Sequence, residues 1–388
     1  MRIKKSSIDT FLVMLVMFVT ILPLFIAKQL VTLSLLFLVL RIVTSEDIFF
    51  YTKKKIIIFI LFMSGIFGAF LLAPEHIVRY LGILLIVLGF PFSSFKIKQS
   101  SIMVLSGLII LYLTITQILL LQGNQIILNF RDFAYYYEGS EVHKNYGTTD
   151  NIFKNLIDFS YWKIRGGGLY SNPNTLSGFV IMYYFIFDIS SSHIKKLINQ
   201  DKKKWLKYFQ WFIFLLVAFC LMTTKSKTFL IAFIAYIIFE HFETIDLLRF
   251  RFKKKVILPF IFGMLILSLF FRKIIEGVLG GGSANIKYSI LMDYFESANV
   301  LALIFGSTYN IFFDTEYGYW FGAAGFLGIF AFYNFYKMVY QFSPNSKALI
   351  ISFLLISLGA SLFYNLLLVS ILIPLFIVLL SSSKKLNE

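Results

Sequence analysis

The feature that most constrains this chain is a succession of long apolar runs joined by mostly short polar connections. Crossing the hydrocarbon of a bilayer takes about 20 apolar residues in a helix. Runs of roughly this kind lie near residues 8–27, 29–44, 56–73, 77–92, 101–121, 175–192, 208–222, 228–241, 256–271, 318–340, 347–362 and 366–381. With 59% hydrophobic and 14% charged residues and a mean hydropathy of +0.80, the composition excludes a water-soluble globular domain. The pattern predicts an all-α, polytopic membrane helix bundle of about twelve transmembrane helices, forming one membrane domain over residues 1–388.

The net charge of +16 follows the topology that these runs imply. The densest basic clusters, in the 193–207 and 242–255 connections, fall on the same side as both termini when the runs alternate across a membrane. Because cytoplasmic loops of membrane proteins are enriched in Lys and Arg, we expect both termini and these two connections to be cytoplasmic. The positive charge therefore needs no nucleic-acid partner to explain it.

Two connections are long, and this topology places both outside: residues 122–172 and residues 272–317. Long loops between short-linked helices usually carry function. Each contains a stretch with amphipathic periodicity, Asn151–Trp162 in the first loop and 286–304 in the second, so we expect short helices there. A Gly-rich run at 280–282 lacks the Lys and Ser or Thr of a phosphate-binding loop, so no nucleotide site is expected.

The most informative segment precedes the run at 175–192. Asn172 is a favourable N-cap and Pro173 a favourable first helical residue, so we expect a helix to begin here with backbone N–H groups open to an anion. Three glycines before it would let the backbone approach a ligand, and Arg165 adds a permanent charge. The alternative interpretation is a flexible loop followed by an ordinary helix cap.

Further cations on the outside face oppose the topology bias and so need another reason. Lys225 and Lys227 lie in a tight turn, Arg272 ends an apolar run, and Arg79 lies at the start of another. Snorkelling to lipid headgroups is one explanation for each of them. Convergence on one face of the bundle would instead suit a polyanion at the membrane surface, such as a lipid-linked pyrophosphate.

Carboxylates and aromatic rings complete the candidate site. Asp314 and Glu316 precede the 318–340 run, and either is a candidate general base, although acids also simply favour a helix N-terminus. Tyr161, Trp162 and Tyr170 are candidate sugar-stacking residues, and an interfacial aromatic belt is the alternative. No spacing typical of metal ligands occurs, so no metal or other cofactor is expected.

Taken together, an Arg followed by Gly and Asn-Pro-Asn at a helix start, a Thr-x-Ser-Lys turn, two long outside loops and a Gly-rich helix after the second loop resemble the O-antigen polymerase and O-antigen ligase superfamily, which includes capsular repeat-unit polymerases. The resemblance implies glycosyl transfer from a polyprenyl-pyrophosphate-linked oligosaccharide on the outer leaflet of the bacterial cytoplasmic membrane, without metal or nucleotide. It also implies a flippase and a chain-length regulator as partners, besides the lipid bilayer.

The resemblance assigns roles to particular residues. Arg165, the 172–174 cap, Lys225 or Lys227, and Arg272 would hold the pyrophosphate. Asp314 stands where the ligases of this family carry a His-Asn pair, which favours a polymerase over a ligase.

Three alternatives stay open at this stage. One is an O-antigen ligase, and another is a flippase or transporter, for which a twelve-helix count would be natural. The third is a membrane acyltransferase, although the four histidines of the chain lie at loops or helix ends: His76, His143, His193 and His241.

Overall fold

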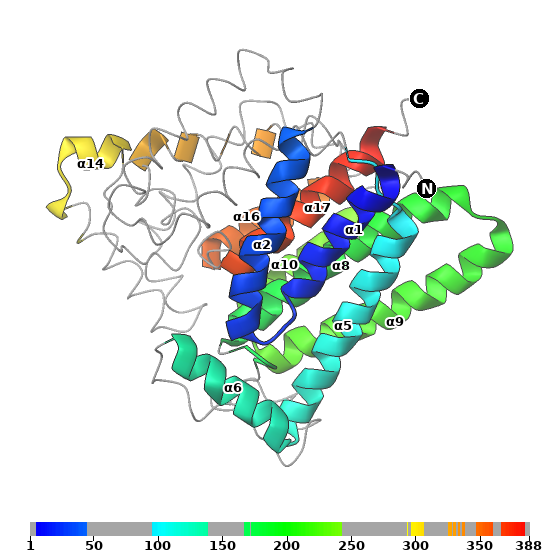
Figure 1. Cartoon of the computed structure of the whole chain (residues 1–388), viewed down its shortest axis with the longest axis horizontal. Coiled ribbons are helices and arrows are strands. Elements are labelled where there is room, and N and C mark those ends of the chain that lie inside the picture. The colour runs from blue at the N-terminus through cyan, green and yellow to red at the C-terminus, as the bar shows by residue number, and fades with distance from the viewer. Residues whose placement is uncertain are drawn as a thin grey trace.

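The structure is a computed structural model of the whole chain. It describes residues 5–44, 95–138, 167–170, 172–242, 293, 296–305, 325–327, 329–330, 333, 336–337, 347–359 and 366–384. The regular elements in these residues are all helices (Figure 1), which confirms the all-α prediction for this part of the chain.

Most helices coincide with predicted apolar runs. They are α1 (Lys5–Val19), α2 (Leu24–Val43), α5 (Gln99–Leu121), α8 (Pro173–Leu197), α9 (Gln200–Thr224), α10 (Lys227–Phe242), α16 (Lys347–Gly359) and α17 (Leu366–Lys384). Two shorter helices lie in the predicted outside loops: α6 (Gln125–Glu138) and α14 (Val300–Phe305). The sequence analysis did not predict α6, and the amphipathic helix expected at 151–162 lies outside the described residues.

Two predicted boundaries were wrong for identifiable reasons. The break between the first two helices falls at residues 20–23, because Pro23 is the N-cap of α2, whereas the runs predicted it near residue 28. The 193–207 connection is largely helical, since α8 continues to Leu197 and α9 begins at Gln200. Lys and Gln are good helix formers that lower hydropathy without ending a helix.

Two of the described helices, α5 and α9, are long and apolar enough to cross a membrane. Shorter apolar helical segments occur at residues 6–19, 29–42, 347–357 and 370–381 within the described ranges. The full number of transmembrane helices expected from the sequence therefore stays a prediction.

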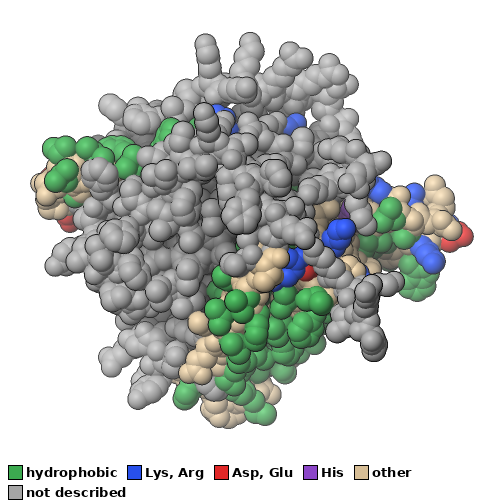
Figure 2. Space-filling model, turned by 45° about the horizontal axis from the view of Figure 1, so that its top comes forward, with side chains coloured by type: hydrophobic (Ala, Val, Ile, Leu, Met, Phe, Trp, Pro, Cys, Tyr) green, Lys and Arg blue, Asp and Glu red, His purple; other side chains and the backbone are tan. Residues whose placement is uncertain are grey.

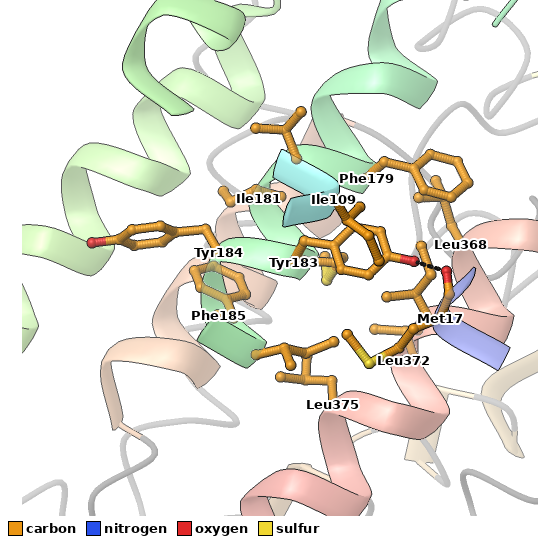
Figure 3. Packing of buried hydrophobic residues seen from close by; sticks show 14 of the residues in the cluster. Met17, Ile109, Phe179, Ile181, Tyr183, Tyr184, Phe185, Leu368, Leu372 and Leu375 are labelled. Atoms are coloured by element: carbon orange, nitrogen blue, oxygen red, sulfur yellow. Dashed lines mark hydrogen bonds between the residues drawn. The ribbon is translucent and has the colours of Figure 1, made fainter. Parts of the chain in front are cut away.

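Helix α8 forms the centre of the packing. It contacts α5, α9 and α17, and its side chains from Leu176 to Phe187 are buried on all sides of the helix. A helix that is apolar all round belongs inside a bundle. The Tyr183 hydroxyl, in the middle of this stretch, donates to the Met17 carbonyl of α1 at 2.6 Å (Figure 3), so the ring satisfies its polar atom within the core.

Polar contacts tie helices together at the bundle end that holds the start of α5. The buried carboxylate of Asp9 on α1 accepts two hydrogen bonds from Arg41 on α2, at 2.6 and 3.2 Å, and one from the Lys96 backbone N–H at 2.9 Å. Because a buried charge needs a full set of partners, this group holds α1, α2 and the start of α5 in one arrangement.

The side chain of Gln99 makes a second tie at the same end. Its Oε1 accepts from Ser190 on α8 at 2.9 Å, and its Nε2 donates to Ser381 on α17 at 2.9 Å. The first turn of α5, the last part of α8 and the last part of α17 therefore share one end of the bundle.

Candidate functional site

The opposite end of α8 begins as the sequence predicts. Asn172 has extended backbone angles, and its side-chain oxygen accepts from the Asn174 N–H at 2.8 Å, with Pro173 as the first helical residue. The Thr175 and Leu176 N–H groups donate to the Asn172 carbonyl at 3.0 and 3.3 Å. The expectation that several N–H groups stand open to a ligand was therefore wrong, because the cap uses them itself.

The two described glycines before this helix form a tight turn. The Tyr170 N–H donates to the Gly167 carbonyl at 2.9 Å, and a Cβ on Gly167 would lie 2.6 Å from the Tyr170 carbonyl oxygen. Gly168 has a φ of +59°, which side-chain-bearing residues rarely adopt. Gly167 thus lets the chain approach its own backbone, and Gly168 supplies the positive φ of the turn.

A buried glutamine of α5, Gln117, holds this turn in place. Its Oε1 accepts from the Gly168 N–H at 2.9 Å, and its Nε2 donates to Thr223 Oγ1 in the last turn of α9 at 3.0 Å. The side chain is 0% exposed. Sequence analysis missed this residue, although an amide inside an apolar run was a visible signal, since polar groups within membrane helices tend to join helices.

The turn between α9 and α10 packs directly on the first turn of α8. The Ser226 hydroxyl donates to Asn174 Oδ1 at 2.9 Å, and the Ser177 hydroxyl donates to Thr224 Oγ1 at 2.7 Å. The structure thus brings together two segments that the sequence singled out separately, residues 172–174 and residues 223–227.

Within this turn the two lysines differ in their surroundings. Lys225 is the C-cap of α9 with φ 53° and ψ 29°, and it is 9% exposed. Lys227 is exposed and begins α10. A left-handed conformation costs a lysine about 1–2 kcal/mol relative to its ordinary backbone states. Lys225 is therefore the lysine that the fold holds in place against an energetic penalty.

Tyr170 has a different role from the one that the sequence suggested. Its ring stacks on Phe179 with a centroid distance of 4.5 Å, and it is 3% exposed. Its hydroxyl donates to the Thr20 carbonyl at 3.4 Å. Burial, followed by the proximity of Tyr183 and Tyr112, raises the pKa of Tyr170 well above its ordinary value. Tyr170 is a buried core residue just before the start of α8. The prediction that its ring stacks on a sugar was therefore wrong.

Helix α6 covers the glycine turn from the side of α5. Ile127 of α6, Leu120 of α5 and Leu169 of the turn form one small buried apolar cluster. Asn124 begins the helix by accepting from the Ile126 N–H at 3.1 Å. The glycine turn is thus fixed by apolar contacts as well as by Gln117.

The remaining predicted residues lie outside the described part of the chain. They are Arg79, Tyr161, Trp162, Arg165, Arg272, Asp314 and Glu316. Among the described residues, no three His, Cys, Asp or Glu side chains gather in a way that could hold a metal ion.

Comparison with known proteins gives no relative: no protein-family model, no curated protein and no solved structure matches this chain.

Proposed function

We propose that this protein is a polysaccharide repeat-unit polymerase, a glycosyltransferase that joins polyprenyl-pyrophosphate-linked oligosaccharides on the outer leaflet of a bacterial cytoplasmic membrane. The observation that carries the proposal is the junction of the α8 start with the α9–α10 turn, through the Ser226–Asn174 and Ser177–Thr224 hydrogen bonds. It sets the turn that carries Lys225 and Lys227 against the first turn of α8. Lysines gathered at such a junction favour a multiply charged anion.

The segments that flank this junction in the sequence carry further positive charges. Lys225 and Lys227 contribute from the turn, and Arg165 precedes Gly167 by two residues in the same loop. A guanidinium fits phosphate oxygens with two parallel hydrogen bonds. Arg272 and Arg79 are the further candidates for the same ligand, and the Asn172–Asn174 cap supplies the scaffold on which the loop is held.

The chemistry needs one proton acceptor. The hydroxyl oxygen of one lipid-linked unit forms a bond to the anomeric carbon of the growing chain, while the bond from that carbon to the pyrophosphate oxygen breaks. The electron pair leaves with polyprenyl pyrophosphate, and the hydroxyl proton passes to Asp314, with Glu316 as the other candidate base. Cations at the leaving group stabilise the charge that develops there, so the reaction needs neither a metal nor a nucleotide.

The proposed topology follows from the distribution of basic residues between the two sides of the membrane. About twelve transmembrane helices with both termini in the cytoplasm would turn the start of α8 and the end of α9 outward, and the lysine-rich start of α9 inward. A flippase would deliver the lipid-linked units to this face, and a chain-length regulator would act on the growing polymer. Tyr161 and Trp162 are the proposed glycan-contacting rings.

The test is to delete the encoding gene and size the lipid-linked glycan that accumulates. Loss of a polymerase should leave single repeat units on the outer leaflet. Long untransferred chains would instead indicate a ligase, and units trapped on the inner leaflet would indicate a flippase. Complementation with Lys225→Met should fail, whereas Lys96→Gln, an exposed lysine at the other end of the bundle, should restore the polymer.

A further inference from the structure

A graded stripe of exposed side chains runs along the first half of α9. Its members, in chain order, are Lys204, Trp205, Lys207, Tyr208, Trp211, Phe212 and Leu215, all of them exposed. Spacings of three and four residues place Lys204 with Tyr208 and Lys207 with Trp211 on the same side of the helix. Trp205 is 79% and Tyr208 70% exposed, so no described part of the chain covers the stripe.

The order of chemical types along the stripe matches the layers of a membrane boundary. The two cations lie in the first part of the series, interleaved with Trp205, aromatic rings with a polar atom continue to Trp211, and purely apolar side chains end the series. Lys places its ammonium in the headgroup layer, Trp and Tyr prefer the interface, and Phe and Leu prefer hydrocarbon. The stripe therefore fits a lipid surface better than it fits a protein partner, which would not require this gradient.

Helix length supports the same placement. The 25 residues of α9 correspond to about 37 Å at 1.5 Å per residue, whereas the hydrocarbon layer is about 30 Å thick. The excess of about 7 Å, or roughly one and a half turns, falls at the start of the helix, because its last turn carries the junction with α8. That start projects from the bundle together with the end of α8 (Figure 1).

Charge at this projecting end is strongly one-sided. Lys195, Lys196, Lys202, Lys204 and Lys207 are exposed, and Asp201 is the one exposed acid between residues 195 and 207. In Figure 2, blue lysine side chains lie beside green hydrophobic ones at the right-hand end of the molecule, where Figure 1 places the α8–α9 connection. A zwitterionic surface would gain little from this excess, whereas an anionic one gains from each lysine.

We propose that the first turns of α9 form a binding surface for the phosphate headgroups of anionic glycerophospholipids, with Lys204 and Lys207 at the headgroups and Tyr208 and Trp211 just below them. This surface lies at the end of α9 opposite Lys225, so it is separate from the proposed pyrophosphate site. It implies that the lipid composition of one leaflet sets the depth and tilt of α9.

The test uses the chain's own tryptophans as reporters. The chain has 4 tryptophans, so a Trp162→Phe/Trp320→Phe background leaves only Trp205 and Trp211. The full-length protein is placed in phosphatidylcholine nanodiscs of two kinds. Both contain a small fraction of lipid that is brominated near the headgroup end of the acyl chains. The brominated lipid is phosphatidylglycerol in one kind and phosphatidylcholine in the other. Bromine quenches tryptophan only at short range, so the ratio of the two quenching efficiencies reports which lipid gathers at the stripe.

We expect brominated phosphatidylglycerol to quench more strongly, and high salt to reduce the difference by screening. Each lysine near the surface should contribute about fivefold to the preference, so Lys204→Gln/Lys207→Gln should lower it by at least tenfold, and Lys204→Arg/Lys207→Arg should retain it. The control Lys96→Gln/Lys98→Gln removes two exposed lysines near the start of α5, at the same bundle end, and should leave the preference unchanged.

Three results would overturn the proposal. One is equal quenching by the two brominated lipids in the parental protein, and another is a preference that survives the double glutamine change. The third is protection of both tryptophans from either lipid, which would mean that a second copy of the chain covers the stripe. None of these outcomes depends on whether the protein is a polymerase.

Discussion

Gln117 Oε1 accepts a hydrogen bond from the backbone N–H of Gly168 at 2.9 Å, across 51 positions of sequence. The same side chain donates to Thr223. One buried amide therefore sets the position of the glycine turn before α8 relative to the last turn of α9, and these are the segments that carry the candidate cations.

Replacing Gln117 by Leu should destabilise the protein by about 1–3 kcal/mol, because the Gly168 N–H loses its acceptor inside the bundle. Thermal unfolding of the purified protein in detergent measures the change. Gln122, exposed at the C-cap of the same helix, supplies the matched control, and Gln122→Leu should shift stability by less than about 0.5 kcal/mol. Equal effects of the two changes would mean that the buried amide does not hold the turn.

Two glycines, Gly167 and Gly178, should respond differently to replacement by alanine. Gly167→Ala places a Cβ 2.6 Å from a backbone oxygen, so the turn must move, whereas in Gly178→Ala the nearest atom, at 3.0 Å, belongs to the flexible Leu368 side chain. Alanine also favours a helix over glycine by about 1 kcal/mol, which offsets the crowding at Gly178. We expect low yield of folded protein for the first variant and near-parental yield for the second, measured by size-exclusion chromatography. The reverse order would contradict the described geometry of the turn.

Lys225→Gly should separate stability from function. Glycine removes the cost of the left-handed conformation, which offsets the loss of side-chain contacts, so the unfolding temperature should stay near the parental value, while loss of the ammonium should abolish polymer formation in cells. Lys227→Ala changes an exposed lysine two residues away and should reduce polymer much less. Parental polymer from Lys225→Gly would exclude this lysine from the site.

Arg165→Ala and Arg272→Ala should each lose most activity while the protein still inserts, because loop cations contribute little to folding but directly to pyrophosphate binding. Arg165→Lys should restore activity only in part, since the paired guanidinium geometry is lost. Immunoblotting of the membrane fraction controls for insertion, and glycan sizing reads activity. Near-normal polymer from the alanine variants would remove both residues from the mechanism.

Asp314→Asn should bind the lipid-linked substrate normally but slow polymerisation by about 10²- to 10⁴-fold, the usual contribution of a positioned base. A reconstituted assay with purified protein and lipid-linked repeat units gives the rate. Glu316→Gln is the companion variant, and it should be affected much less. If only the Glu316 change slows the reaction, the base lies elsewhere in this loop, and if only a change at His143 does so, the base lies in the first outside loop.

Local signals in the sequence predicted several elements well. The Asn172–Pro173 pair fixes where α8 begins, because an N-cap and a first-turn proline act within a few residues. The apolar runs located most of the described helices, because burial of a whole helix needs a whole run of apolar residues. The junction of residues 172–174 with the lysine turn appeared in the sequence only as two separate motifs on the same expected face.

Other features depended on contacts between residues far apart in the chain. Tyr170 looked like an exposed ring in a loop, yet Phe179 and Thr20 enclose it. Gln117 was one polar residue in an apolar run, and its partners lie on two other segments. Helix α6 has a mixed composition that did not mark it as a helix in the sequence. Its packing on Leu120 and Leu169 fixes its position in the structure. Periodicity and capping are properties of neighbouring residues, so the sequence by itself determined where most helices form and that the chain is helical and apolar. Which polar side chains meet inside the bundle was decided only by the tertiary structure, because those contacts depend on how packed helices bring distant positions together.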